Sequence, residues 1–162
     1  MDLWYRIFAA HDTMPVPADL DACLAGAGVP WRVAVDGDAG GWYRADILMA
    51  EDSSLVLERW LSDEEGIRAE LNSWAAYLET CEDSAHSRDL MERTIQAKQL
   101  FTLRRPGKIA DAERIERTCL ALSRHLATVT NGFYQIDGRG FFAADGTLLV
   151  KEPFASEGLP GP

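Results

Sequence analysis

The densest group of residues able to do acid–base or metal chemistry is the acidic run Asp63, Glu64 and Glu65. Either chemistry needs two carboxylates that converge on one point. Adjacent residues of a helix point about 100° apart, so these carboxylates diverge if the run is helical. Negative charge is also favourable at a helix N-terminus, which by itself accounts for the run. We therefore predict a structural role for it and no metal site.

Cysteine and histidine offer little for nucleophilic or zinc chemistry. Cys81 and His86 are the one such pair close in sequence, and the two acidic residues between them would raise the pKa of a thiol. His11 and His125 are isolated, and no zinc-binding spacing is present. The three cysteines are widely spaced and odd in number, which argues against a disulfide framework. We predict no catalytic residue.

The motifs that bind nucleotides or activate a serine are missing as well: the sequence has no G-x-G-x-x-G, P-loop or G-x-S-x-G pattern, and we predict no cofactor. Arg104 and Arg105 form a basic cluster with Lys108, followed by Arg114 and Arg117. An acidic ligand could bind there. The alternative, which charge patterning favours, is that these cations neutralise the acidic helix predicted upstream.

A ligand cleft between a sheet and its helices would need polar groups that converge in one apolar pocket. The candidates to line such a cleft are Glu58, Arg104, Arg105 and His125.

These residues are positioned by elements organised around the stretch 54–79, in which a short strand leads into a long amphipathic helix. Ser62, followed three residues later by Glu65, has the pattern of a capping box and predicts the start of that helix. Its apolar residues recur at helical spacing and are predicted to bury one face: Ile67, Leu71, Trp74 and Leu78.

Hydrophobic periodicity and turn residues predict the remaining elements. Strands are predicted at 3–10, 31–35, 42–49, 54–60, 99–105, 132–136, 140–143 and 147–150. Further helices are predicted at 17–25, 85–96 and 111–130. The segment 99–105 could instead prolong the helix before it. The helix opened by Asp111 is expected to bury Ile115, Cys119, Leu122, Leu126 and Val129.

This order predicts an α+β fold, with antiparallel strands and the helices packed on one face. The first half is compatible with a ferredoxin-like unit. At 162 residues we expect a single compact domain over 1–151, or two packed halves at about 1–80 and 81–151. Residues 152–162 are expected to form a flexible tail.

Composition limits the partners. The formal net charge of −10 disfavours nucleic acid phosphates and is compatible with a basic partner. No apolar run approaches the ~20 residues that a membrane span needs, and the N-terminus lacks the pattern of a signal peptide. We therefore expect a cytoplasmic protein that binds neither nucleic acid nor a membrane.

Four segments, spread over most of the length of the chain, resemble a family of small uncharacterised bacterial proteins: LWYRIF, LERWLSDEEGIRAELNSWAAYLE, QAKQLFTLRRP and NGFYQIDGRGFFAADGTLLV. The resemblance implies a shared fold and brings no activity or site residue.

The leading hypothesis is a non-enzymatic, immunity-like or regulatory domain that binds another protein. Aromatic residues on an open sheet face would also allow a homodimer. The alternative is a small-molecule binding protein or weak enzyme with a cleft between sheet and helices.

Overall fold

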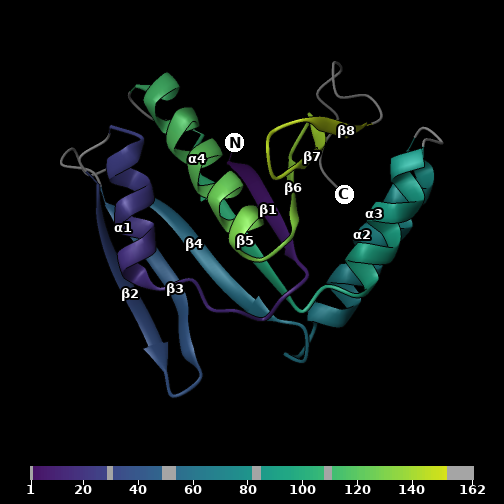
Figure 1. Cartoon of the computed structure of the whole chain (residues 1–162), viewed down its shortest axis with the longest axis horizontal. Helices are drawn as coiled ribbons and strands as arrows, with labels where there is room; N and C mark the ends of the chain where they lie inside the picture. Colours follow the sequence, from purple (N-terminus) through teal and green to yellow (C-terminus); the bar gives the residue numbers. More distant parts are fainter. Residues whose placement is uncertain (1, 29–30, 49–53, 82–84, 108–110, 153–162) are drawn as a thin grey trace.

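A computed structural model describes residues 2–28, 31–48, 54–81, 85–107 and 111–152, and Figure 1 shows the arrangement of the chain. The helices are α1 (Pro17–Gly26), α2 (Ile67–Thr80), α3 (Ala85–Ile95) and α4 (Ala112–Val129). The strands are β1 (Leu3–Ala9), β2 (Arg32–Asp38), β3 (Gly41–Leu48), β4 (Ser54–Leu61), β5 (Gln99–Arg105), β6 (Phe133–Ile136), β7 (Gly140–Ala143) and β8 (Leu148–Lys151). Apart from Glu152, the expected tail lies outside the described residues.

The strands form one eight-stranded sheet in the order β2-β3-β4-β5-β1-β6-β7-β8. Every pairing is antiparallel, which confirms the α+β prediction. β1 lies between β5 and β6, so the first strand of the chain pairs only with strands from its second half. A ferredoxin-like first half is therefore not formed, because its split β-α-β unit would place one strand between β1 and β2, whereas β3, β4 and β5 lie between them here.

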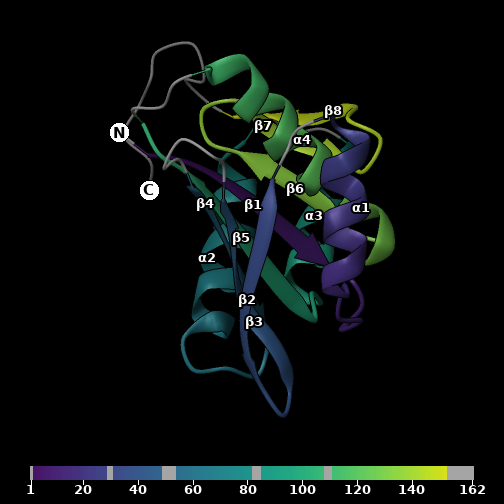
Figure 2. The ribbon, with the colours of Figure 1, turned by 90° about the vertical axis from the view of Figure 1, so that its left-hand side faces the viewer.

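The helices cover both faces of the sheet. This corrects the expectation of one covered face (Figures 1 and 2). Successive side chains of a strand point to opposite faces. Tyr5 and Ile7 of β1 accordingly enter a core with α1 and α4, whereas Phe8 enters a second core with α2 and α3. At one end, the central strands β1 and β5 are apolar on both faces, with Ala9 and Phe101 on one face and Phe8 and Leu100 on the other, so each face needs its own layer of helices to exclude water.

The second core is largely aromatic. The rings of Phe8 and Phe133 stack with centroids 5.0 Å apart, and Trp74 of α2 meets Phe8 edge-on at 6.1 Å. Leu71 and Leu78 of α2 are fully buried beside them. The predicted apolar face of this helix is therefore correct.

The predicted start of α2 is wrong. The helix begins at Ile67, after Gly66 in the left-handed region with φ 85°, and no side chain caps it. Ser62 lies in the turn before the helix, where the carboxylate of Glu64 accepts a hydrogen bond from the backbone N–H of Leu61. The acidic run thus belongs to a turn, since the chain leaving β4 must first reverse direction.

The limits of α4 and β5 agree with the local sequence signals that predicted them. Asp111 caps α4 by accepting a hydrogen bond from the backbone N–H of Arg114, and residues 99–105 form a strand, as predicted. Val129 is 41% exposed instead of buried, because the buried stripe continues from Leu126 to Thr130. In the described part of the chain, no helix combines the length and hydropathy needed to span a membrane.

A buried arginine fixes the loop that follows β1. Arg59 of β4 is 7% exposed and donates from Nε to the side-chain oxygen of Gln99, 2.8 Å away. The amide nitrogen of Gln99 in turn donates to the carbonyls of His11 and Thr13. Burial lowers the pKa of the Arg59 guanidinium.

Candidate functional site

Helices α2 and α3 pack against one end of their face of the sheet and leave the other end open. On that open part, Arg44 of β3 and Ala34 of β2 are exposed. Where the open part meets the start of α2, the surface forms a groove of about 320 Å³. The groove is lined chiefly by Trp4, Arg6, Glu58, Trp60, Glu70 and Thr102. We refer to it as the tryptophan groove.

Strand register brings these residues together. Thr102 of β5 lies opposite Arg6 of β1 on one side and opposite Glu58 of β4 on the other. The same row continues to Arg44 of β3 and to Gln135 of β6. Residues directly opposite one another in a sheet share a face, so a polar row crosses five strands at the floor of the groove.

Hydrogen bonds position the two tryptophans beside this floor, one through its indole ring and the other through its backbone. The Trp60 Nε1–H donates to Thr102 Oγ1 at 3.3 Å, and the backbone N–H of Trp4 donates to Asp137 at 3.3 Å. Both tryptophans are half-buried, so part of each ring borders the groove.

Arg6 forms one wall of the groove, and its positive charge is neutralised by an ion pair. Its guanidinium carbon lies 4.7 Å from the ring centroid of Trp74 and 5.9 Å from that of Trp4. Its NH1 nitrogen donates to Asp137 at 2.6 Å and to the side-chain oxygen of Gln135 at 2.9 Å. The charge of Arg6 is therefore balanced by Asp137 and does not make the groove positive.

A half-buried carboxyl group, that of Glu152, lies next to this wall. Gln135 is fully buried and donates from its amide nitrogen to Glu152 at 2.6 Å. Burial raises the pKa of the Glu152 carboxyl.

Two further carboxylates give the groove its negative charge. Glu58 is half-buried, and within the described residues no ion pair or hydrogen bond to its carboxylate is found. The neighbouring cation, Arg44, is paired with Asp46 at 3.1 Å. Glu70 accepts a hydrogen bond from the Trp74 Nε1–H at 3.1 Å. Aromatic faces beside carboxylates suit an ammonium or guanidinium group, which interacts with both.

The four predicted ligand residues do not converge. Glu58 lines the tryptophan groove, whereas Arg104, on the same sheet face, lies outside its lining and pairs with Asp2 at 3.5 Å. Arg105 points to the opposite face and donates to the carbonyl of Ala112 at 3.5 Å. His125 is on α4, where its Nε2 atom is buried without a hydrogen-bond partner in the described structure.

The predicted basic cluster also separates. Charge patterning favoured a pairing of this cluster with the acidic residues of α2. Arg104 instead forms an ion pair with Asp2, near the N-terminus. Lys108 lies outside the described residues.

The thiols are poorly suited to nucleophilic chemistry. Burial raises the pKa of Cys81 to about 11 and that of Cys119 to about 12. The half-buried Cys23 is shifted in the same direction for the same reason. Over the described ranges, no group of three or more His, Cys, Asp or Glu side chains is placed to hold a metal ion.

Sequence reasoning did not identify Trp4, Trp60, Arg6 and Glu70 as members of one site. A partial signal was present, because Trp4 with Arg6, and Glu58 with Trp60, are two residues apart and must share a strand face. Nothing local indicated that β1 and β4 both flank β5. Comparison of the chain with models of known protein families, with curated proteins and with solved structures found no match.

Proposed function

We propose that this chain is a non-enzymatic binding domain that receives a lysine or arginine side chain of a basic partner protein in the tryptophan groove. The observation that carries the proposal is the combination of two half-buried indoles, Trp4 and Trp60, with the carboxylates of Glu58 and Glu70. Arg6 does not oppose a cation there, because Asp137 neutralises it.

The energetics favour such an anchor. A cation over an aromatic face contributes about 0.5–2 kcal/mol, depending on how far it is desolvated. A hydrogen bond to a charged group adds roughly 1.5–3 kcal/mol. One arginine or lysine inserted between the indoles would make both interactions, as a buried anchor does in many protein interfaces.

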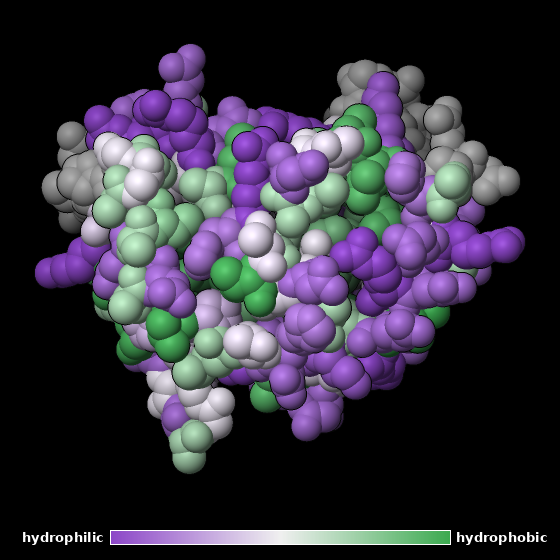
Figure 3. Space-filling view, viewed as in Figure 1, coloured by the Kyte–Doolittle hydropathy of each residue, from purple (hydrophilic) through white to green (hydrophobic). Residues whose placement is uncertain are grey.

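The charge of the whole molecule supports the same class of partner. At a formal net charge of −10, long-range attraction would accelerate encounters with a basic protein, and this acceleration would weaken with salt. Figure 3 shows the face of the molecule that carries α1 and α4, where hydrophilic side chains alternate with separate groups of apolar ones. From this charge and the aromatic anchors of the groove, we infer an immunity-like or regulatory role.

We place this role in the cytoplasm. The three cysteines are free, and a reducing compartment would keep them so.

The alternative function, a small-molecule binding protein or weak enzyme, has less support. It was argued from convergence of Glu58, Arg104, Arg105 and His125, and only Glu58 lines the groove.

Affinity capture at low salt tests the proposal with two matched variants. Glu58→Gln/Glu70→Gln removes the charge of the groove, and its glutamines can still accept the Trp74 hydrogen bond. Glu79→Gln/Glu113→Gln changes exposed residues elsewhere and has the same net charge. We expect the wild type and the control to retain the same basic protein, and the groove variant to bind it at least about tenfold more weakly.

A peptide with one central arginine provides the direct measurement. Its addition should shift the indole N–H signals of Trp4 and Trp60 in NMR spectra, and the same peptide with neutral citrulline should not. A partner retained equally by both variants, or equal shifts with both peptides, would overturn the proposal.

A further inference from the structure

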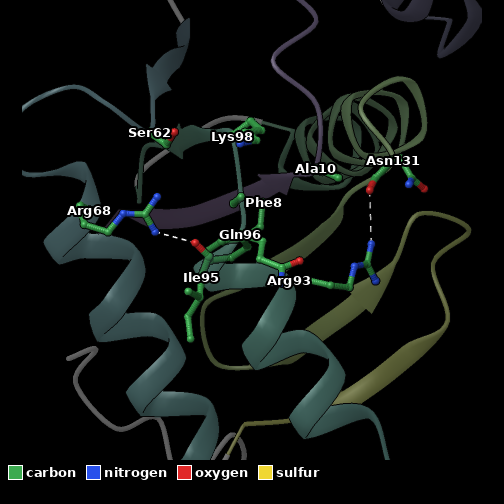
Figure 4. A pocket seen from close by; sticks show the side chains of 10 residues that line it. Phe8, Ala10, Ser62, Arg68, Arg93, Ile95, Gln96, Lys98 and Asn131 are labelled. Atoms are coloured by element: carbon green, nitrogen blue, oxygen red, sulfur yellow. Dashed lines mark hydrogen bonds between the residues drawn. The ribbon is translucent and has the colours of Figure 1, made fainter.

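A second pocket, of about 420 Å³, lies where the segment that joins β4 to α2 meets the connection from α3 to β5 (Figure 4). Three cationic side chains line it: Arg68, Arg93 and Lys98. Its remaining polar side chains are those of Ser62, Gln96 and Asn131. We refer to it as the cationic pocket. None of its lining residues lines the tryptophan groove.

The three cations come from different elements. Arg68 is in the first turn of α2, Arg93 in the last turn of α3, and Lys98 in the connection from α3 to β5. Figure 4 shows the two arginines on either side of the Ile95–Gln96 segment. The backbone N–H of Lys98 donates to Ala9 at 2.8 Å, and the Lys98 carbonyl accepts from the backbone N–H of Ser62 at 3.0 Å. The pocket wall is thus tied to the ends of β1 and β4.

Both guanidinium groups are held in place by backbone carbonyls. Arg68 NH1 donates to the Ile95 carbonyl at 2.6 Å, and Arg93 NH2 donates to the Asn131 carbonyl at 3.4 Å (Figure 4). Arg93 also lies 5.0 Å from the ring centroid of Phe133. A guanidinium carries five N–H donors, so each arginine makes one hydrogen bond to a backbone carbonyl and keeps donors for a ligand.

The charge of the pocket contrasts with that of the molecule. The chain carries a formal net charge of −10, yet the lining of this pocket holds three cations and no carboxylate. Arg93 has one acidic neighbour, Asp89, at 3.8 Å. Among the described residues, no carboxylate lies within ion-pair distance of Arg68 or Lys98. Hydrogen bonds to carbonyls at helix ends explain why the two arginines lie here. They do not explain why Lys98 lines the same pocket.

We propose that the cationic pocket binds a small polyvalent oxyanion, either a phosphate ester or a di- or tricarboxylate. Planar guanidinium groups match the paired oxygens of both, and the Lys98 ammonium supplies further positive charge. The hydroxyl of Ser62 and the amides of Gln96 and Asn131 are available to the remaining oxygens. A volume of about 420 Å³ lies in the range of sites for metabolite-sized ligands.

Isothermal titration at constant ionic strength tests this proposal with inorganic phosphate, pyrophosphate and citrate as probes and chloride as the background anion. We expect saturable binding of at least one probe. Lys98→Glu should weaken it about tenfold or more, because one attraction becomes a repulsion. The side chain of Lys98 makes no described hydrogen bond or ion pair, so this variant should fold, as circular dichroism can check.

Lys151→Glu is the matched control, since it places the same charge change at an exposed position on β8, outside the pocket lining. It should leave binding within about twofold, which corresponds to a screened surface charge. Binding of phosphate and pyrophosphate alone would assign the pocket to phosphate esters, and binding of citrate alone to carboxylates. No binding at millimolar probe, or equal weakening by both variants, would overturn the proposal.

Discussion

The three thiols illustrate how burial, and not sequence neighbours, sets reactivity at the scale of the residue. Sequence drew attention to Cys81 because His86 follows it. In the fold, Cys81 is 7% exposed and Cys119 is fully buried within the core under α4. Cys23 is half-buried on α1, with its Sγ atom 3.5 Å from the carbonyl of Ala121. Exposure therefore ranks Cys23 first for reaction with a reagent.

We predict that thiol labelling of the native protein at pH 7.5 is slow and reaches Cys23 before Cys81 and Cys119. The reactive species is the thiolate, and a pKa raised to about 11 or 12 leaves very little of it at that pH. Because these folded-state pKa values lie above those of the unfolded chain, protonated thiols stabilise the fold. That contribution is present at neutral pH and is lost as the pH rises above about 9.

The measurement is labelling followed by mass spectrometry of peptides, in buffer and in urea, across a pH series. Unfolded protein should label quickly at all three positions, which provides the control. Rapid, selective labelling of native Cys81 would contradict the prediction and revive a Cys81–His86 nucleophile.

At the scale of the element, α2 determines where both pockets lie. The turn that precedes α2 contributes Gly66 to the tryptophan groove and Ser62 to the cationic pocket. The first turn of α2 contributes Glu70 to the groove and Arg68 to the pocket. The helix is anchored by Trp74, whose ring contacts Phe8 and Phe141. The left-handed backbone of Gly66 sets its direction of entry.

We predict that three substitutions in this unit destabilise the protein in a fixed order. Trp74→Ala should lower the free energy of unfolding by roughly 3–5 kcal/mol, because it leaves a cavity in the aromatic core. Gly66→Ala should cost about 1–2 kcal/mol from backbone strain alone, since nothing lies within 4 Å of an added Cβ atom. Ser62→Ala should change stability by less than about 0.5 kcal/mol, because Ser62 caps nothing.

Urea unfolding of the three variants measures this order. A loss for Ser62→Ala as large as that for Gly66→Ala would mean that the serine caps the helix in solution. Such a result would restore the start of α2 that the sequence indicated.

At the scale of the whole molecule, charge is segregated and the sheet edge is protected. Three cations gather in the cationic pocket, whereas the net charge is strongly negative. The edge strand β2 carries Arg32, Asp36 and Asp38, and its pairing with β3 is interrupted by a bulge after Asp36. Charges and bulges are features that prevent two edges from pairing, which argues against a homodimer built on this edge.

We predict that the protein does not bind DNA or RNA near physiological salt. A phosphate backbone is followed by a stripe of cations that releases counterions, and a single pocket with three cations offers too short a track. A gel shift with mixed-sequence DNA and RNA is the measurement, with a basic nucleic-acid-binding protein as positive control. A salt-sensitive shift at low micromolar protein would refute the prediction.

Features that depend on neighbours along the chain could be predicted from local sequence. The buried stripe of Leu71, Trp74 and Leu78 and the cap at Asp111 were predicted correctly. For 99–105 the sequence predicted a strand but left a helix open, and the structure has a strand. Helical and strand periodicity, and the preference of aspartate for a helix N-terminus, act over a few residues, so local sequence is sufficient to show them.

The order of the strands in the sheet, and therefore the position of the site, could be read only from the three-dimensional structure. β1 pairs with β5 and β6, and β4 pairs with β5, through contacts between residues far apart in sequence. That order places Trp4 and Arg6 across β5 from Glu58 and Trp60, and all four line the same groove. The same strand order gives the sheet an apolar region on each face, and helices bury both regions. Strand order depends on the burial of the whole sheet, and no local pattern carries that information.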